Sequence, residues 1–300
     1  MKILVTGGTG FIAAWVIRRL MTAGHAVRVL DVRADRSEIR QILGPSAASV
    51  EWQIGDIRDP KSVSAAMQGC DGVAHLAAIL TPDCQKNPIL GAEINLIGAL
   101  NIFEAARQNN LRHVVYASSA GVYGPDDGST PHPITHYGAF KLAVEGSARA
   151  YWEDHKVSSI GFRPFVVYGP GRESGLTAGP TFACRAAARG ENYTIPYTGI
   201  SDMLYVDDLA AAFEAALDKP LGGAHVFNLV GEVASTEQVV AEIHRNVPGA
   251  KIDAAGPKLP SSATIDMDPD VERLLGALPR TPLAEGIKKT IAYYRQLETQ

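Results

Sequence analysis

The stretch KILVTGGTGFIA, residues 2–13, decides the fold. KILVT is apolar and β-branched, as in a buried strand, and the apolar spacing of 11–24 predicts a helix that ends at Gly24. Gly7 permits a tight turn between them, and Gly10 lets the backbone approach a pyrophosphate that the helix N-terminus stabilises. We therefore expect Gly7, Gly10, Phe11 and Ile12 to contact a dinucleotide.

The same alternation continues outward along the chain. Further strands are predicted at 26–31, 50–54, 72–76, 112–117 and 157–162, with helices at 60–68, 88–109 and 136–155. Strands that alternate with helices indicate a parallel sheet covered on both faces, so we predict an α/β fold with a Rossmann-type doubly wound parallel sheet.

The regular alternation of strands and helices ends after Pro164. From there, Gly- and Pro-rich loops separate predicted helices at 207–218, 235–247 and 282–298. We expect an NAD-binding Rossmann domain over 1–165 and a smaller C-terminal substrate-binding lobe over 166–300. A strand at 225–229 is expected either within this lobe or back in the main sheet.

Composition excludes several classes of function. The 300 residues carry a net charge of −4 without a run of like charges, which argues against a nucleic-acid or membrane surface. No apolar run approaches the roughly 18 residues of a membrane span, and the N-terminus does not resemble a secretory signal. The three cysteines are widely spaced, so neither a disulfide framework nor a metal site is indicated. We expect a soluble, cytoplasmic protein.

Polar groups at the strand ends predict the cofactor. Asp31 ends the second strand, where a carboxylate accepts hydrogen bonds from both adenosine ribose hydroxyls and repels a 2′-phosphate. NAD is thus favoured over NADP, although Arg33 is placed to pair with a 2′-phosphate. The next strand ends, GDI and HLAA, add Asp56 for the adenine amino group and small residues beneath the cofactor. The further cofactor contacts predicted there are Ile57, Leu76, Ala77 and Ala78.

Tyr137 and Lys141 lie one helical turn apart in THYGAFKLAVEG. A phenol has a pKa near 10, and an ammonium within about 6 Å stabilises its phenolate. Ser119 follows the fifth strand, at the sheet edge where α/β proteins bind ligands. We expect Tyr137 to take a proton from a substrate hydroxyl as hydride leaves the same carbon, while Ser119 holds the oxygen and Lys141 also bonds the nicotinamide ribose. The spacing alone is equally typical of a surface Tyr–Lys pair.

As a set, the motifs resemble the extended short-chain dehydrogenases/reductases, the NAD-dependent epimerase/dehydratase family. They run from residue 1 to about 215 and comprise TGGTGFI, Asp31, GDI, HLAA, the Asn95–Gly98 pair, SSAGVYG, YGAFK, RPFVVYGPG and LYVDD. The resemblance implies a catalytic triad of Ser119, Tyr137 and Lys141, with Asn95 supporting it and Pro164 and Val166 lining the nicotinamide pocket. It also implies a homodimer formed through the helices at 88–109 and 136–155.

Two departures from this family bear on the substrate. Nucleotide-sugar enzymes usually carry Asn where this chain has Val166, and Arg where it has Ser201. A diphosphate would lose contacts there, each charged one worth about 1.5–3 kcal/mol, and the chain also looks short for that group. We therefore expect a small sugar, sugar acid or polyol, with Arg172 either pairing its carboxylate or remaining a solvated loop residue. The predicted substrate contacts are Thr81, Ser118, Ser119, Arg172 and Thr177.

Three functions are weighed. The first is an NAD-dependent dehydrogenase that releases NADH. The alternative is a sugar or nucleotide-sugar epimerase that retains its cofactor and uses the same three residues. The third is a non-catalytic dinucleotide sensor, a class that tends to lose the Tyr or the Lys, both of which are present here.

Overall fold

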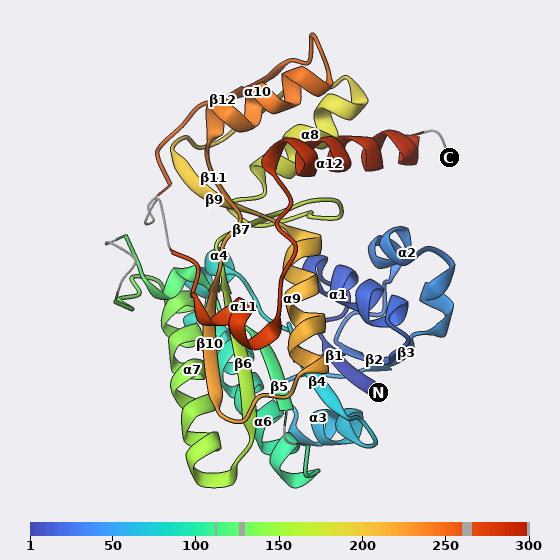
Figure 1. Cartoon of the computed structure of the whole chain (residues 1–300), viewed down its shortest axis with the longest axis vertical. Coiled ribbons are helices and arrows are strands. Elements are labelled where there is room, and N and C mark those ends of the chain that lie inside the picture. The colour runs from blue at the N-terminus through green and yellow to red at the C-terminus, as the bar shows by residue number, and fades with distance from the viewer. Residues whose placement is uncertain (112, 126–129, 260–265, 299–300) are drawn as a thin grey trace.

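Seven parallel strands form the main sheet of the computed structural model, which describes residues 1–111, 113–125, 130–259 and 266–298 (Figure 1). Their order is β10-β6-β5-β4-β1-β2-β3, so the sequence of strands reverses direction between β1 and β4. This arrangement confirms the predicted Rossmann-type fold class. The strands are β1 (Lys2–Thr6), β2 (Ala26–Asp31), β3 (Glu51–Ile54), β4 (Gly72–His75), β5 (His113–Ala117), β6 (Ser158–Pro164) and β10 (Ala224–Leu229).

Helices cover both faces of this sheet. One face carries α1 (Phe11–Thr22), α2 (Ser37–Leu43), α9 (Val206–Asp218) and α11 (Asp270–Leu275), and the other carries α3 (Pro60–Met67), α6 (Gly98–Gln108) and α7 (His136–His155). A 3₁₀ turn, η1 (Gly44–Ser49), follows α2. The predicted strand at 112–117 is described from His113, and Arg112 lies outside the described residues.

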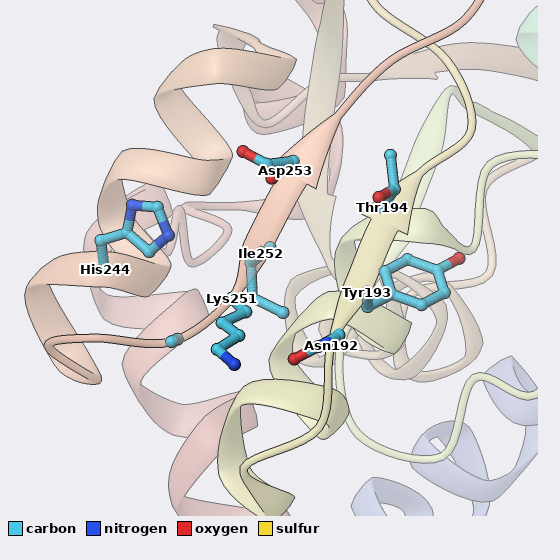
Figure 2. A pocket seen from close by; sticks show the side chains of 8 residues that line it. Asn192, Tyr193, Thr194, His244, Lys251, Ile252 and Asp253 are labelled. Carbon is cyan, nitrogen blue, oxygen red and sulfur yellow. The ribbon is translucent and has the colours of Figure 1, made fainter.

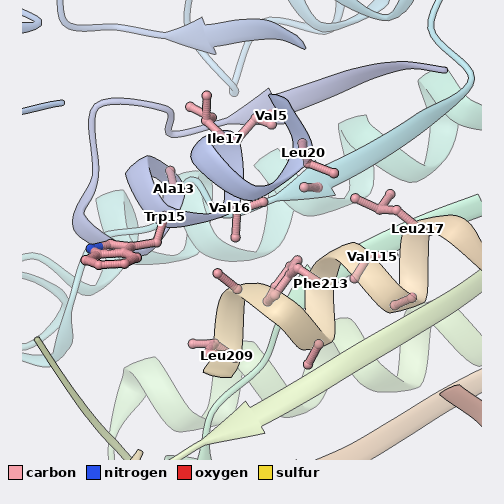
Figure 3. Packing of buried hydrophobic residues seen from close by; sticks show 14 of the residues in the cluster. Val5, Ala13, Trp15, Val16, Ile17, Leu20, Val115, Leu209, Phe213 and Leu217 are labelled. Atoms are coloured by element: carbon pink, nitrogen blue, oxygen red, sulfur yellow. The ribbon is translucent and has the colours of Figure 1, made fainter. Parts of the chain in front are cut away.

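The packing of α1 on α9 shows why the apolar spacing of 11–24 was informative. Val16 and Leu20 on α1 lie toward Leu209 and Phe213 on α9, and all four are fully buried (Figure 3). Burying each such side chain contributes about 1.5–3 kcal/mol. This contact fixes the helix whose first turn faces the predicted phosphate site.

The predicted helix 88–109 is interrupted. It consists of α5 (Pro88–Ala92), a π-helical turn η2 (Glu93–Ile97) and α6, and it follows α4 (Thr81–Lys86). Pro88–Gln108 is the one described stretch that is long and apolar enough to cross a membrane by composition, and somewhat under half of it is buried. It packs against α3 and α7, as a core helix does.

The C-terminal lobe lies beyond one end of the main sheet (top of Figure 1). A three-stranded sheet contains β11 (Glu232–Ser235), β9 (Ile200–Tyr205) and β7 (Val166–Tyr168), and a two-stranded sheet contains β12 (Ile252–Ala254) and β8 (Tyr193–Ile195). The lobe's helices are α8 (Gly179–Arg189), α10 (Thr236–Asn246) and α12 (Leu283–Glu298). Of these elements, only α10 and α12 match predicted ranges.

The predicted strand at 225–229 returns to the main sheet. It forms β10, which pairs in parallel with β6 over six residues, from Ala224 opposite Ser159 to Leu229 opposite Pro164. With α9, this strand places part of the range 166–300 on the Rossmann sheet. The predicted domain boundary at 165/166 is therefore not a clean division of the chain. It remains a prediction for the elements after residue 165 that lie in the lobe and not on the main sheet.

Candidate active site

The glycine-rich turn after β1 has room for a ligand on one side only. Gly7 has φ +67°, and a Cβ there would lie 2.7 Å from Ala77 Cα and 2.8 Å from Ala77 N. A Cβ at Gly10 would meet Gly7 O at 3.1 Å, with no other described atom of another segment within 4 Å. The backbone is thus pressed against the HLAA segment at Gly7 and open at Gly10, as a pyrophosphate cradle requires. Phe11 and Ile12 follow, half-buried, at the start of α1.

Thr6, which sequence reasoning missed, joins the ends of β1 and β4 where the strand order reverses. Its Oγ1 lies 2.8 Å from His75 Nδ1 and accepts hydrogen bonds from the N–H groups of Leu76 (3.2 Å) and Ala77 (3.3 Å). Leu76, Ala77 and Ala78 are half-buried beside Gly7. The predicted floor of the cofactor site is therefore fixed to the first strand.

Asp31 is held against the phosphate turn by Thr9. Its Oδ2 accepts from Thr9 N (2.9 Å) and Thr9 Oγ1 (2.7 Å), and its Oδ1 accepts from Arg33 N (2.9 Å). The Arg33 guanidinium is exposed, with Nε 4.0 Å from Asp31 Oδ1. A buried carboxylate fixed at this point fits a ribose diol, and Arg33 flanks it rather than neutralising it by a close contact.

Asp56 is already engaged by a neighbouring arginine. Arg58 Nη2 donates to Asp56 Oδ2 at 2.6 Å, and hydrogen bonds from Arg58 hold the pKa of this carboxyl below its usual range. Ile57 is buried, and a Cβ on Gly98 would lie 2.8 Å from its Cγ2. These two adenine-side contacts remain predictions, with most acceptor positions of Asp56 taken in this structure.

The three predicted catalytic residues come together at the end of β5. Ser119 caps the turn η3 (Ala120–Val122), where its Oγ accepts from Gly121 N at 3.0 Å, and its hydroxyl is near enough to Tyr137 to act on the pKa of the phenol. Lys141 Nζ lies 5.5 Å from the centre of the Tyr137 ring and donates to Ala117 O at 2.7 Å. The serine, the phenol and the ammonium thus have the mutual placement that proton transfer needs.

Gly138 makes this approach possible. A Cβ there would lie 2.2 Å from Gly121 O, so only glycine lets the first turn of α7 rest on η3. Thr135 caps the helix by accepting from Gly138 N at 3.0 Å. Position 138, next to Tyr137, therefore has no space for any side chain.

Burial dominates the electrostatics of this site. It raises the pKa of Tyr137 to about 12, against lowering contributions from the Ser119 hydrogen bond and the Arg172 charge. It lowers the pKa of Lys141 to about 8, against raising contributions from Cys84 and Glu145. The expected lowering of the phenol pKa is thus not found in the protein alone, where burial dominates, and Tyr137 is protonated at neutral pH.

Asn95 supports the site from inside the π-helical turn. Its Oδ1 accepts from Ile79 N and its Nδ2 donates to Ile79 O, both at 2.9 Å. It also donates to Cys84 Sγ at 3.2 Å, and Cys84 is fully buried. Asn95 itself is only 1% exposed, so it acts by fixing the loop after HLAA.

Arg172 brings a positive charge to the substrate side. It donates to Val167 O, to Thr177 Oγ1 at 2.8 Å and to Ser174 O at 3.3 Å, all of them uncharged acceptors. No carboxylate among the described residues lies within ion-pair distance of it. Burial lowers its pKa to about 10, and its charge reaches Tyr137. This guanidinium is available to an anion next to the Tyr137 phenol.

Other predicted substrate contacts are placed differently. Ser118 is 2% exposed and donates to Glu145 Oε1 at 2.5 Å, so we leave it out of the proposed substrate site. Thr81 is half-buried at the start of α4, and Thr177 accepts from Arg172. Val166 and Ser201 are both buried, and Pro164 is buried at the end of β6.

A surface hollow of about 460 Å³ lies in the C-terminal lobe (Figure 2). It opens between β8, β12 and α10, and its polar lining includes Asn192, Thr194, His244 and Asp253. None of the predicted site residues lines it, so it is separate from the site above.

One curated relative matches over nearly its whole length. UDP-glucose 4-epimerase of Mycolicibacterium smegmatis is 30% identical over 313 residues, covering 98% of this chain and 99% of the relative. The length of this chain therefore does not argue against a nucleotide-sugar enzyme. The comparison favours the epimerase alternative over the dehydrogenase without deciding between them.

Solved structures agree with the fold and the motifs. UDP-glucose 4-epimerase from Thermotoga maritima, crystallised with UDP-glucose, superposes with a TM-score of 0.86 at 25% identity over 99% of this chain and 100% of that one. The Thermus thermophilus UDP-glucose 4-epimerase complex with NAD gives 0.83 at 27% identity over 98% and 99%. The profile of the NAD dependent epimerase/dehydratase family matches residues 3–230. The predicted resemblance, enzymatic class and NAD cofactor are confirmed, and the chain belongs to the NAD dependent epimerase/dehydratase family.

Proposed function

We propose that this protein is an NAD-dependent epimerase that inverts a hydroxyl-bearing carbon of an anionic sugar, with nucleotide sugars of the UDP type as the first candidates. The observation that carries the proposal is the joint placement of Ser119, Tyr137 and Lys141 beside Arg172, a cation with no close carboxylate among the described residues. The end-to-end similarity to UDP-glucose 4-epimerases supports the same reaction.

The chain's own residues account for the proton side of this chemistry. When bound, NAD supplies a hydride acceptor and a positive ring. Tyr137 removes the proton from the substrate hydroxyl as that carbon loses hydride, and Ser119 holds the oxygen while it becomes a carbonyl. Tyr137 then returns the proton when hydride is restored to the opposite face. To act as the base, Tyr137 must start as the phenolate, which the Lys141 ammonium would stabilise together with the positive ring of bound NAD; between the two steps Tyr137 is the neutral phenol, and returning the proton restores the phenolate.

Arg172 would hold the negative charge of the substrate. Its Nη atoms are oriented by Val167 O and Thr177 Oγ1, so the guanidinium plane is fixed before a ligand arrives. A fork of this kind suits a diphosphate or a carboxylate equally well. With Val166 and Ser201 in place of the usual amide and guanidinium, Arg172 is the main cation that we assign to this task.

The test is turnover of UDP-glucose, UDP-galactose and UDP-glucuronate with the purified protein, followed by NMR of the products. The expected result is interconversion of hydroxyl epimers without net absorbance in the reduced-nicotinamide band. Oxidised product together with released NADH would contradict the epimerase proposal. If the wild-type protein turns over none of the anionic sugars tested, the proposed substrate class of anionic sugars is contradicted.

A second candidate is the dehydrogenase of a small sugar acid or polyol. The specific observation in its favour is the pair of buried, uncharged side chains at Val166 and Ser201, which offer a diphosphate neither an amide nor a positive charge. It predicts stoichiometric NADH from free sugar acids and none from UDP-sugars. The same assay therefore separates the two candidates. A sensor without catalysis is disfavoured because Tyr137 and Lys141 are both present and in place.

We further propose that the protein works as a homodimer in the cytoplasm. Ile89 is 72% exposed and Ile97 is 45% exposed on the Pro88–Gln108 segment, and α7 presents Ala139 and Ala143 outward. Sedimentation of the wild type and of an Ile89→Glu, Ile97→Glu double variant tests this, with a monomeric variant expected. A wild type that sediments as a monomer would contradict it.

A further inference from the structure

Three consecutive residues at the end of β5 each engage α7. The Ser119 hydroxyl acts on the pKa of Tyr137, Ala117 O accepts from Lys141 Nζ at 2.7 Å, and Ser118 Oγ donates to Glu145 Oε1 at 2.5 Å. The partners on the helix are one turn apart at each step, so they form a ladder along one side of α7. The first two rungs contain the catalytic groups, and the third rung has no role in the chemistry described above.

The third rung is a buried ion pair rather than a single hydrogen bond. Arg163 on β6 donates to Glu145 through Nε (2.8 Å) and Nη2 (2.5 Å), with 3% of the Glu145 side chain exposed and 15% of the Arg163 side chain. Arg163 Nη1 also donates to Tyr123 OH at 2.5 Å, and Tyr123 OH donates to Asn228 Oδ1 on β10 at 2.9 Å. Glu145 thus links α7 to β5, β6 and the returning strand at once.

Lys141 meets several titratable groups. Glu145 and Cys84 raise its pKa, while His75 at the end of β4 is neutral at working pH because burial, with Lys141's charge, lowers its pKa to about 3. Burial also raises the pKa of the Cys84 thiol, which keeps it uncharged. Tyr137 is protonated at neutral pH. Glu145 is therefore the anionic group that faces Lys141 across one turn of helix.

We propose that Glu145 is a positioning residue of the active site, which locks the strand end bearing Ser119 onto α7 and balances the charge of Lys141 from behind. It touches neither substrate nor cofactor. Arg163 neutralises the charge of the Glu145 carboxylate and links it to the main sheet through β6. The kinetic test of this inference rests on the proposed function. The titration of Lys141, described below, tests it without turnover.

The experiment compares Glu145→Gln, Glu145→Asp and Glu145→Leu with Asp207→Asn as the matched control. Asp207 forms a partly buried pair with Arg19 (Nε to Oδ1, 2.8 Å) between α1 and α9, away from the ladder. Glutamine keeps an acceptor for Ser118 but removes the charge, aspartate keeps the charge on a shorter arm, and leucine removes both. The Lys141 titration is followed by NMR of ¹³C-labelled lysine, assigned with Lys141→Arg, so this readout needs no turnover.

Glu145→Gln is expected to move the Lys141 titration down by about one pH unit, a tenfold change in its protonation equilibrium. The alkaline limb of kcat/KM should move with it, and kcat should fall about tenfold while KM changes less than about twofold. Glu145→Asp should recover the titration, and Glu145→Leu should lose a further order of magnitude in kcat. Asp207→Asn should lower thermal stability only.

An unchanged Lys141 titration in Glu145→Gln, or losses in the Glu145 variants no larger than in Asp207→Asn, would overturn the proposal. If the leucine variant does not fold, the aspartate and glutamine variants still decide. If no sugar is turned over by the wild type, the proposed function fails, while the titration still confirms or refutes the role of Glu145.

Discussion

The two sides of the active site are built in opposite ways. On the catalytic side, the functional groups of Ser119 and Lys141 are each anchored by a neighbour, and the approach of α7 is set by a glycine that accepts no substitute. On the substrate side, Arg172 stands in a loop that turns through Gly169, Gly171 and Gly175, all with positive φ, and contacts only uncharged acceptors. Closely packed reacting groups thus face a glycine-rich loop that carries a single cation. The difference predicts that changes on the first side lower kcat, and changes on the second raise KM.

The largest effect is expected for Tyr137→Phe, which tests whether changes on the catalytic side lower kcat. Removing the proton-transfer group should lower kcat by about 10²–10⁴-fold, because general acid–base help of that size is lost. NAD binding and the unfolding midpoint should change little, which fluorescence titration and calorimetry check. Wild-type turnover in this variant would end the assignment of Tyr137.

Gly138→Ala probes the same side without touching a reacting group. The added Cβ would lie 2.2 Å from Gly121 O, so α7 must move away from Ser119, and kcat should fall about 10²-fold. Gly146→Ala on the same helix is the control, since its Cβ would meet nothing within 4 Å. That control should keep its activity and gain up to about 1 kcal/mol in unfolding free energy. Equal activity in both variants would refute the docking argument.

Arg172→Met moves the test to the substrate side. Loss of a charged hydrogen-bonding partner worth about 1.5–3 kcal/mol should raise KM for an anionic sugar about 10- to 100-fold, with kcat reduced far less. The KM of Arg172→Lys should lie between those of the wild type and Arg172→Met, because lysine keeps the positive charge but loses the two parallel N–H donors of the guanidinium. A variant that loses kcat and keeps KM would move Arg172 to the catalytic side.

Asp31→Ser sharpens the comparison at the cofactor. Without the carboxylate that Thr9 holds in place, the Kd for NAD should rise about tenfold, since hydrogen bonds to the ribose are lost. The Kd for NADP should fall at the same time, with Arg33 nearby. Calorimetric titration of both cofactors measures this, and an unchanged preference would contradict the predicted ribose contact.

The smallest effect concerns pH. Lys141 is charged below its pKa of about 8 and neutral above it, so activity should decline as pH rises through 8, and Lys141→Arg should abolish this decline. Between about pH 8 and 10.5 the unfolded chain holds a proton that the folded one has lost, so this group makes stability rise with pH over that window. A pH–rate profile and unfolding at several pH values check both signs. An alkaline limb that persists in Lys141→Arg would assign it to another group.

The sequence predicted the catalytic side better than the substrate side for a physical reason. Gly7, Asp31, Ser119 and Tyr137 follow strands or begin helices of strong periodicity, so topology alone brings them to one edge of the sheet. The lobe is built from three- to six-residue strands and from α8, a helix that begins with Gly-Pro and that the apolar spacing did not predict. Short elements of this kind are formed by tertiary contacts and carry little local signal.

The partners of Ser118 show a second limit. Nothing near Ser118 in the chain indicates that its hydroxyl binds Glu145, because 27 residues separate them and the pairing depends on how α7 docks on β5. Thr6 and Thr9 were missed for the same reason. They hold cofactor residues in place through contacts that bridge strands, and only the folded sheet brings these groups together.

The return of β10 to the main sheet has a consequence for the newborn chain. Strands β1 to β6 can assemble as soon as they leave the ribosome, but β6 finds its outer neighbour only after the whole segment from Val166 to Ala224 has been translated. During that interval β6 offers a row of unpaired backbone groups, the surface on which chains join wrongly. Until β10 has been synthesised, the outer edge of β6 is therefore the place where a newly made chain is most exposed to pairing with another chain.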